Sequence, residues 1–207
     1  MKLYWSDVLK PRSACAVAKY LESPVEYVYV DLGRGEQRRP DYLALNPNGK
    51  VPTLVDGALA LWEADAIMCH LAARCDSELW PQDARQTEAI RWFSWNHQHF
   101  TQPGGALYFE HIIRPRFGLG EADAAEVERA LHEWRRAAAV LDGHLQHRNY
   151  VVGDSLTLAD FALAVALPHA TRAHIPLAEF PAVRRWHERM NELEAWREPF
   201  PEIAVAA

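Results

Sequence analysis

NPNGKVPTLVDGALALWEADAI, residues 46–67, holds the strongest structural signals in the sequence. Asp56-Gly57 lies between the apolar runs TLV and ALALW, a pattern typical of a β-hairpin. Pro52 stands directly before the first run, where a proline marks an edge or a bend because it lacks a ladder donor. Glu63 follows the second run and precedes apolar residues at helical spacing. The stretch predicts a hairpin and then a helix, with a gap in backbone pairing beside Pro52.

The residues before this stretch predict a β-α-β unit. KLYW (2–5) and EYVYVD (26–31) are rich in residues that favour strands. Between them, Ser13 is placed to cap a helix and Pro24 to end it. The apolar positions of this helix recur at helical spacing: Ala14, Val17, Ala18 and Leu21. We therefore expect the order β-α-β, irregular loop, β-β-α over the first part of the chain.

The rest of the chain predicts helices only. DSELWPQDARQ (76–86) is polar and contains a proline, as a linker between domains often does. Apolar residues then step by four and three along one long helix: Val127, Leu131, Trp134, Ala138, Leu141 and Leu145. Thr157 and Asp160 have the spacing of a capping box. We expect one domain over 1–76, a linker over 77–86 and an all-helical domain over 87–207.

Composition narrows the classes of function. Of 207 residues, 22 are Lys or Arg and 28 Asp or Glu, and the cations are dispersed, which argues against a nucleic-acid partner. No apolar run approaches the ~20 residues of a membrane span. Three cysteines without a C-x-x-C indicate reduced thiols. The first residues contain no uninterrupted apolar run of a signal peptide, so we expect a cytoplasmic protein. His97 and His99 point to different helix faces, so we predict no metal.

These features together resemble the soluble glutathione transferases. The resemblance rests on NPNGKVPTL (46–54), on EADAI (63–67) and on the stretch from Gly153 to Asp160. It also rests on the division of the chain into a shorter N-terminal domain and a longer C-terminal one. It implies an α/β thioredoxin-like domain followed by an all-α domain. It also implies a homodimer that detoxifies small hydrophobic electrophiles by joining them to the thiol of glutathione, its co-substrate.

The resemblance implies which residues bind glutathione. Pro52 would follow a cis peptide bond, and Val51 would offer its backbone N–H and C=O to the cysteinyl part of the peptide. Glu63 would receive the α-ammonium, while N–H groups at the helix start, beside Ala64, receive the α-carboxylate. Ala64 stands where the family commonly has Ser, which removes one side-chain hydrogen bond. The glycyl carboxylate would lie near Lys50, Gln37 and Arg38.

The group that stabilises the thiolate is expected near the start of the first helix. Ser13 is the leading candidate, because a hydroxyl at a helix N-terminus can donate to sulfur. Lys10, at the position where one bacterial class has its cysteine, could act by charge. Ser6 and Cys15 are further positions in the same segment. In the helical domain the resemblance implies three neighbours of the electrophile: Tyr108, Phe109 and Arg114.

Two other functions remain open at this point. One is an enzyme that uses glutathione as a reductant, isomerisation cofactor or dehalogenating nucleophile. A mixed disulfide trapped on Cys15 would favour the reductase. The other is a non-catalytic module on the same fold that binds a protein partner. Turnover of a generic electrophile would discriminate between the module and the enzymes.

Overall fold

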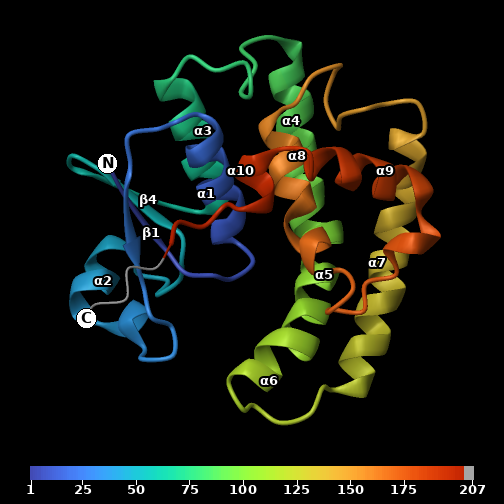
Figure 1. Cartoon of the computed structure of the whole chain (residues 1–207), viewed down its shortest axis with the longest axis horizontal. Coiled ribbons are helices and arrows are strands. Elements are labelled where there is room, and N and C mark those ends of the chain that lie inside the picture. The colour runs from blue at the N-terminus through green and yellow to red at the C-terminus, as the bar shows by residue number, and fades with distance from the viewer. Residues whose placement is uncertain (203–207) are drawn as a thin grey trace. The chain divides into compact units, whose positions relative to one another are not determined.

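Residues 1–202 are described by a computed structural model (Figure 1). The chain forms two compact units. The first contains Met1–Trp80 together with the segment that begins at Leu193, and the second is Pro81–Glu192. The final segment therefore groups with the N-terminal unit, whereas the expected helical domain ran to the end of the chain.

The first unit is a small mixed sheet with helices. Within the described residues its strands are β1 (Lys2–Trp5), β2 (Glu26–Tyr29), β3 (Thr53–Asp56) and β4 (Leu59–Trp62), in the spatial order β2-β1-β3-β4. β1 pairs with β2 in parallel and with β3 antiparallel, and β4 is antiparallel to β3. The helices are α1 (Pro11–Tyr20), η1 (Glu36–Arg38), α2 (Pro40–Leu45) and α3 (Ala64–Arg74). The predicted β-α-β and β-β-α order is confirmed.

The hairpin and the core of this unit follow from local sequence. β3 and β4 are joined by Gly57 and Ala58, and Gly57 has φ 58°, a left-handed conformation that glycine adopts at little cost. α1 and α3 pack against each other. The apolar positions predicted for α3 are all buried: Ala64, Ile67, Met68 and Leu71. Burial of such side chains contributes roughly 1.5–3 kcal/mol each, which makes this helix pair a main source of stability.

A C-terminal segment completes the first unit. It contains α10 (Glu194–Arg197), which contacts α1. The buried Arg12 guanidinium donates a 2.6 Å hydrogen bond to the Trp196 carbonyl and lies 5.0 Å from the centroid of the Trp196 ring. Phe200 stacks on Trp5, with 5.1 Å between ring centroids. These contacts join the two ends of the chain.

The second unit is helical in its described residues. Its helices are α4 (Ala84–Trp95), η2 (Asn96–Phe100), α5 (Thr101–Tyr108), η3 (Phe109–Ile113), α6 (Arg114–Arg116), α7 (Ala124–Leu145), α8 (Leu158–Leu163), η4 (Ala164–His169), η5 (Leu177–Glu179) and α9 (Pro181–Met190). The long helix predicted from its apolar spacing is α7 (Figure 1). η2 and η3 are π-helical turns that interrupt an otherwise α-helical run.

The predicted capping box begins α8. Thr157 is the N-cap, and its N–H donates a 2.9 Å hydrogen bond to Asp160 Oδ2. Asp160 Oδ1 accepts further bonds from the Val151 N–H and the Trp186 indole N–H. Because the carboxyl group is fully buried, its pKa is raised to about 6, although these donors act in the opposite direction. Asp160 thus ties the start of α8 to a preceding loop and to α9.

Candidate functional site

The register of the sheet brings three chain segments to one edge, the one formed by the end of β1, the start of β3 and the end of β4. Thr53, the first residue of β3, pairs with Tyr4 near the end of β1 and with Trp62 at the end of β4. The β1–α1 loop, the Val51–Pro52 turn and Glu63 therefore all leave the sheet at the same edge. This convergence places most of the predicted glutathione residues of the first unit in one region.

Val51 presents an unpaired stretch of backbone at this edge. The Val51–Pro52 peptide bond is cis, and Pro52 is buried. Among the described residues, no hydrogen bond joins the Val51 N–H or C=O to another group. The preceding Lys50 carbonyl is held by the Tyr42 hydroxyl at 2.7 Å and by the Asn46 amide at 2.8 Å. The free donor and acceptor of Val51 are suited to pair with an extended peptide.

Glu63 occupies a strained position before α3. Its φ is 72° and its ψ 121°, a region that residues with a side chain rarely adopt. Such a conformation costs on the order of 1–3 kcal/mol and is concentrated at functional sites. The side chain is exposed and does not cap the helix. Its carboxylate and the first N–H groups of α3, beside the buried Ala64, are thus available to a ligand that carries both charges.

Lys10, and not Ser13, is the N-cap of α1. The helix begins at Pro11 because proline is favoured at the first helical position, where no donor is needed. Ser13 therefore lies inside the first turn, buried, and its hydroxyl donates to the Lys10 carbonyl at 3.3 Å. The prediction that Ser13 caps the helix was wrong. Its proposed role toward sulfur stays a prediction.

The Lys10 side chain is half-buried and faces acidic charge. Burial lowers the pKa of its ammonium, and the carboxylates of Asp65 and Glu63 act in the opposite direction. Sequence reasoning did not single out Asp65, which lies in the first turn of α3. The only available signal was an acid at that position, and acids there are common because they favour the helix dipole.

Three polar residues lie near the Gly49–Lys50 turn or in η1. Lys50 and Arg38 are exposed, and neither side chain has a hydrogen-bond or ion-pair partner in the described part of the chain. Gln37 Oε1 is buried without a hydrogen-bond partner among those residues. The Gln37 carbonyl would lie 3.1 Å from a Cβ at Gly49, so η1 and this turn are neighbours. Cationic groups of this kind can bind a carboxylate.

Ser6, Cys15 and Cys69 are not exposed nucleophiles, and the exposed Cys75 directly follows the end of α3. Ser6 and Cys15 are buried, and burial raises the pKa of the Cys15 thiol far above its ordinary value. The thiol of the half-buried Cys69 has its pKa raised to about 12 by burial and by Asp65. A thiolate, the reactive form, is disfavoured at both cysteines.

The three predicted electrophile neighbours lie in one stretch of the second unit. Tyr108 is buried, with its ring centroid 4.9 Å from that of His169, and Phe109 is exposed. The Arg114 guanidinium lies 5.7 Å from the Phe109 ring centroid. Arg114 Nε is also 2.6 Å from Glu110 Oε2, an ion pair in which the N–H is poorly aligned with the oxygen. Arg114 therefore has a structural partner, and its role toward a substrate stays a prediction.

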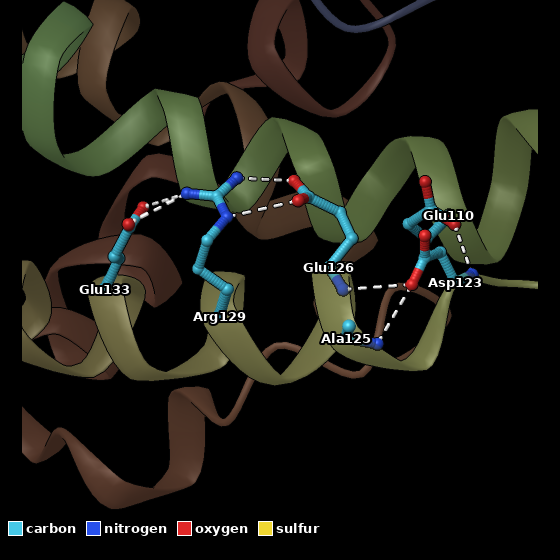
Figure 2. Close-up of polar contacts among 6 residues, drawn as sticks. All are labelled: Glu110, Asp123, Ala125, Glu126, Arg129 and Glu133. Atoms are coloured by element: carbon cyan, nitrogen blue, oxygen red, sulfur yellow. Dashed lines mark hydrogen bonds and ion pairs between the residues drawn. The ribbon is translucent and has the colours of Figure 1, made fainter.

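Glu110 connects this stretch to α7. Its carboxylate is buried and accepts a 2.7 Å hydrogen bond from the Asp123 N–H, directly before α7 (Figure 2). Asp123 in turn accepts hydrogen bonds from the N–H groups of Ala125 and Glu126. This donor and the Arg114 charge hold the pKa of Glu110 below its ordinary range. The contacts fix the start of α7 relative to η3.

An open groove of about 760 Å³ runs along α7 in the second unit. Figure 2 shows one of its lining residues, Arg129, held between Glu126 and Glu133 on successive turns of this helix. By contrast, the exposed Arg136 has no partner among the residues that the structure covers. The groove is lined by Trp95, Gln98, His99, Gln102, Arg129, Glu133, Arg136, Ala137, Ala139 and Val140.

Residues 1–202 contain neither a metal-binding cluster nor a membrane-spanning helix. Within that range, no three His, Cys, Asp or Glu side chains are grouped so that they could hold a metal ion. The same residues contain no helix with the length and apolar character needed to cross a membrane.

Family comparisons match both parts of the chain. The pattern described as "Glutathione S-transferase, N-terminal domain" matches residues 3–73, and "Glutathione S-transferase, C-terminal domain" matches residues 96–194. The sheet-edge region and α7 thus fall within the two matched domains.

Individual proteins show the same similarity over most of their length. Glutathione S-transferase 3 of Zea mays is 36% identical over 187 residues, covering 87% of this chain and 83% of the relative. The disulfide-bond oxidoreductase YfcG of Escherichia coli (strain K12) is 30% identical, covering 84% and 83%. A solved structure of Ure2p in complex with glutathione superposes with a TM-score of 0.84 at 26% identity, covering 96% of this chain and 97% of that one.

Proposed function

The chain belongs to the glutathione S-transferase family, and we propose on that premise that it conjugates the thiol of glutathione to small hydrophobic electrophiles. The observation that carries the proposal is the unpaired backbone of Val51 at the edge where Glu63 and Lys10 converge. We further propose a glutathione-binding domain over 1–76, a linker over 77–86 and a helical domain with the electrophile pocket over 87–207.

Glutathione would be bound along this edge mainly through backbone groups. Its cysteinyl residue would exchange two hydrogen bonds with Val51, next to Pro52, as a strand adds to a sheet. Its α-ammonium would pair with Glu63, and its α-carboxylate would accept hydrogen bonds from the start of α3, by Ala64. Its glycyl carboxylate would lie beside Lys50, with Arg38 and Gln37 as further partners, because these groups are unpaired in the described residues.

Catalysis would consist of stabilising the thiolate. The thiol proton leaves to water, and the thiolate sulfur then forms a bond with an electrophilic carbon, from which a leaving group departs in a substitution. Lys10 would stabilise the anion by charge, with Ser13 as a donor once its bond to the Lys10 carbonyl is broken. Tyr108, Phe109 and Arg114 would contact the electrophile.

Binding and turnover test this proposal directly. Titration calorimetry should detect one glutathione per chain, and absorbance should detect conjugation to chlorodinitrobenzene. The S-methyl form of glutathione is a matched probe, because it should bind but not react. Binding without turnover of any electrophile would favour the non-catalytic module, and no binding would overturn the proposal.

A glutathione-dependent reductase is the second candidate, favoured by the 30% identity to the disulfide-bond oxidoreductase YfcG. Cys15 is fully buried and its thiolate is disfavoured, so such an activity would use glutathione thiols and not a mixed disulfide on Cys15. Reduction of a small disulfide that persists in Cys15→Ala would support this function.

A homodimer in the cytoplasm completes the proposal. Exposed apolar side chains occur in both units, among them Trp62 on β4 and Val140 beside the α7 groove, and such surfaces are typical of interfaces. Light scattering should give twice the chain mass of 23.6 kDa at micromolar concentration. A mass equal to one chain would contradict the homodimer, and the groove along α7 would then be open in solution.

A further inference from the structure

The Lys50 carbonyl, directly before Val51, is held by two buried side chains to which the proposed function gives no role. The Tyr42 hydroxyl donates to it at 2.7 Å and the Asn46 amide at 2.8 Å. These residues are only 6% and 2% exposed, and they lie in α2 and directly after it. Both polar groups also contact the fully buried Thr53 hydroxyl, at 2.9 Å and 3.1 Å. The side chains and the carbonyl therefore form one buried polar network.

The direction of each hydrogen bond in this network follows from its donors. The Asn48 N–H donates to Asn46 Oδ1 at 3.0 Å, so the Asn46 NH₂ group faces the carbonyl and the Thr53 hydroxyl. The Tyr42 hydroxyl gives its proton to the carbonyl, and burial raises its pKa, which keeps that proton in place. The Thr53 hydroxyl then donates to the Tyr42 oxygen. Every donor has an acceptor, and a satisfied buried network favours one geometry.

This geometry sets the direction of the Val51 N–H. The Lys50 carbonyl and the Val51 N–H belong to one trans peptide unit, in which the two groups point in opposite directions. Since the carbonyl faces the buried Tyr42 and Asn46 side chains, the Val51 N–H points away from them. It has no hydrogen-bond partner in residues 1–202. The proposed function assigns it to the cysteinyl carbonyl of glutathione.

We propose that Tyr42, together with Asn46, is a positioning residue that keeps the Val51 N–H directed toward glutathione. The inference rests on the proposed function and goes beyond it, because both side chains act through the Lys50 carbonyl and not on the ligand. A peptide unit that is already ordered loses less conformational freedom when the ligand binds, so affinity is higher.

Tyr42→Phe is the sharpest test of this role. It keeps the ring, whose centroid lies 5.8 Å from that of Tyr4, and removes only the hydroxyl. Glutathione affinity, measured by calorimetry, should fall about 2-fold to 10-fold, the range expected for one hydrogen bond. S-methyl glutathione should lose affinity by the same factor, because Val51 would contact the peptide and not the sulfur. In turnover, KM should rise while kcat and the thiol pKa of bound glutathione stay unchanged.

Tyr27→Phe is the matched control, since it removes a hydroxyl from a half-buried tyrosine on β2 of the same unit. It should leave the affinity for both ligands unchanged. A purely structural role of Tyr42 would lower the melting temperature of Tyr42→Phe but not the affinity of the folded variant. Equal affinity of this variant and the unchanged protein would therefore overturn the inference. A lower kcat with a shifted thiol pKa and an unchanged KM would also overturn it.

A second measurement needs no glutathione. The NMR shifts of the Lys50 carbonyl carbon and the Val51 amide nitrogen report the hydrogen bonds to this carbonyl. Both should change in Tyr42→Phe and not in Tyr27→Phe, and unchanged shifts would refute the inference. If the unchanged protein binds no glutathione, the proposed function fails, and so does the ligand named here. If it binds glutathione and Tyr42→Phe binds it equally well, only the inference fails.

Discussion

Glu63 combines a strained backbone conformation with an exposed carboxylate. Its unusual backbone conformation turns the chain from β4 into α3 and leaves the carboxylate exposed at the sheet edge. A residue whose only role was to start a helix would be more stable as glycine, which adopts this φ freely. The proposed contact with the ammonium of glutathione would account for an acid at this position.

Replacing Glu63 by Gln tests this explanation. The substitution keeps the shape but removes the charge, so glutathione affinity should fall by roughly 1.5–3 kcal/mol, or about 10-fold to 150-fold. Calorimetry measures the affinity, and circular dichroism checks the fold. An unchanged affinity in a folded variant would mean that Glu63 does not contact the ammonium.

Lys50 gives a prediction about the opposite end of the peptide. Lys50→Met should weaken glutathione binding by at most about 5-fold, since an exposed ion pair contributes at most about 1 kcal/mol. An analogue whose glycyl carboxylate is an amide should bind the variant and the unchanged protein equally. Loss of affinity for both ligands would place Lys50 elsewhere in the recognition of glutathione.

At the level of elements, the Asp160 carboxylate in the capping box of α8 accepts four hydrogen bonds and connects this helix to a loop and to α9. Asp160→Asn keeps the shape of the side chain, but its amide NH₂ group cannot accept hydrogen bonds from the buried N–H donors that Asp160 binds. We expect a loss of about 3 kcal/mol in the free energy of unfolding by denaturant. The control is Asp83→Asn at the exposed N-cap of α4, which should lose no more than about 1 kcal/mol.

The stacked rings of His111 and His174 predict a pH dependence. Their centroids are 4.4 Å apart, and burial and then His174 lower the pKa of His111, while Glu110 acts in the opposite direction. Below about pH 6.5 the unfolded chain therefore binds a proton that the folded chain resists, so stability falls as the pH decreases.

The variant His111→Phe removes this titration and keeps an aromatic ring. Its melting temperature should fall less between pH 7 and pH 5 than that of the unchanged protein, as measured by calorimetry at both pH values. The exposed His132→Phe is the control and should behave like the unchanged protein. Equal losses in all three proteins would exclude His111 as the cause.

Local signals predicted these elements well where the pattern had one interpretation. The Asp56-Gly57 hairpin, the apolar face of α3 and the capping box all depend on residues within a few positions of one another. The start of α1 was misjudged because Ser13 suits a cap, whereas Pro11 favours the first helical position. The π-helical turns η2 and η3 were not predicted, since their sequences also fit an α-helix.

At the scale of the whole molecule, long-range contacts were beyond sequence reasoning. Arg12 and Trp196 are 184 positions apart, and nothing in either local sequence indicates their contact. The sequence patterns identified most residues of the candidate site individually, and the sheet register explains why they meet.

Removing the C-terminal segment should destabilise the first unit in particular. A chain that ends at Glu192 lacks the Trp196 carbonyl that Arg12 contacts and the Phe200 ring that stacks on Trp5. It also lacks the fully buried Trp196 side chain, and loss of such a side chain costs about 3–5 kcal/mol. Hydrogen exchange should show faster exchange in α1 and β1 than in α7. Equal exchange in the shortened and complete chains would contradict this.

The contact between Arg12 and Trp196 also has a consequence for synthesis on the ribosome. Residues 81–192 form a contiguous unit, so they can complete their packing while translation continues. The N-terminal unit begins to be translated first, yet its helix α10 follows residues 81–192 and leaves the exit tunnel only after them. The first unit is thus completed after the second has been synthesised, and until then α1 lacks its contact with Trp196.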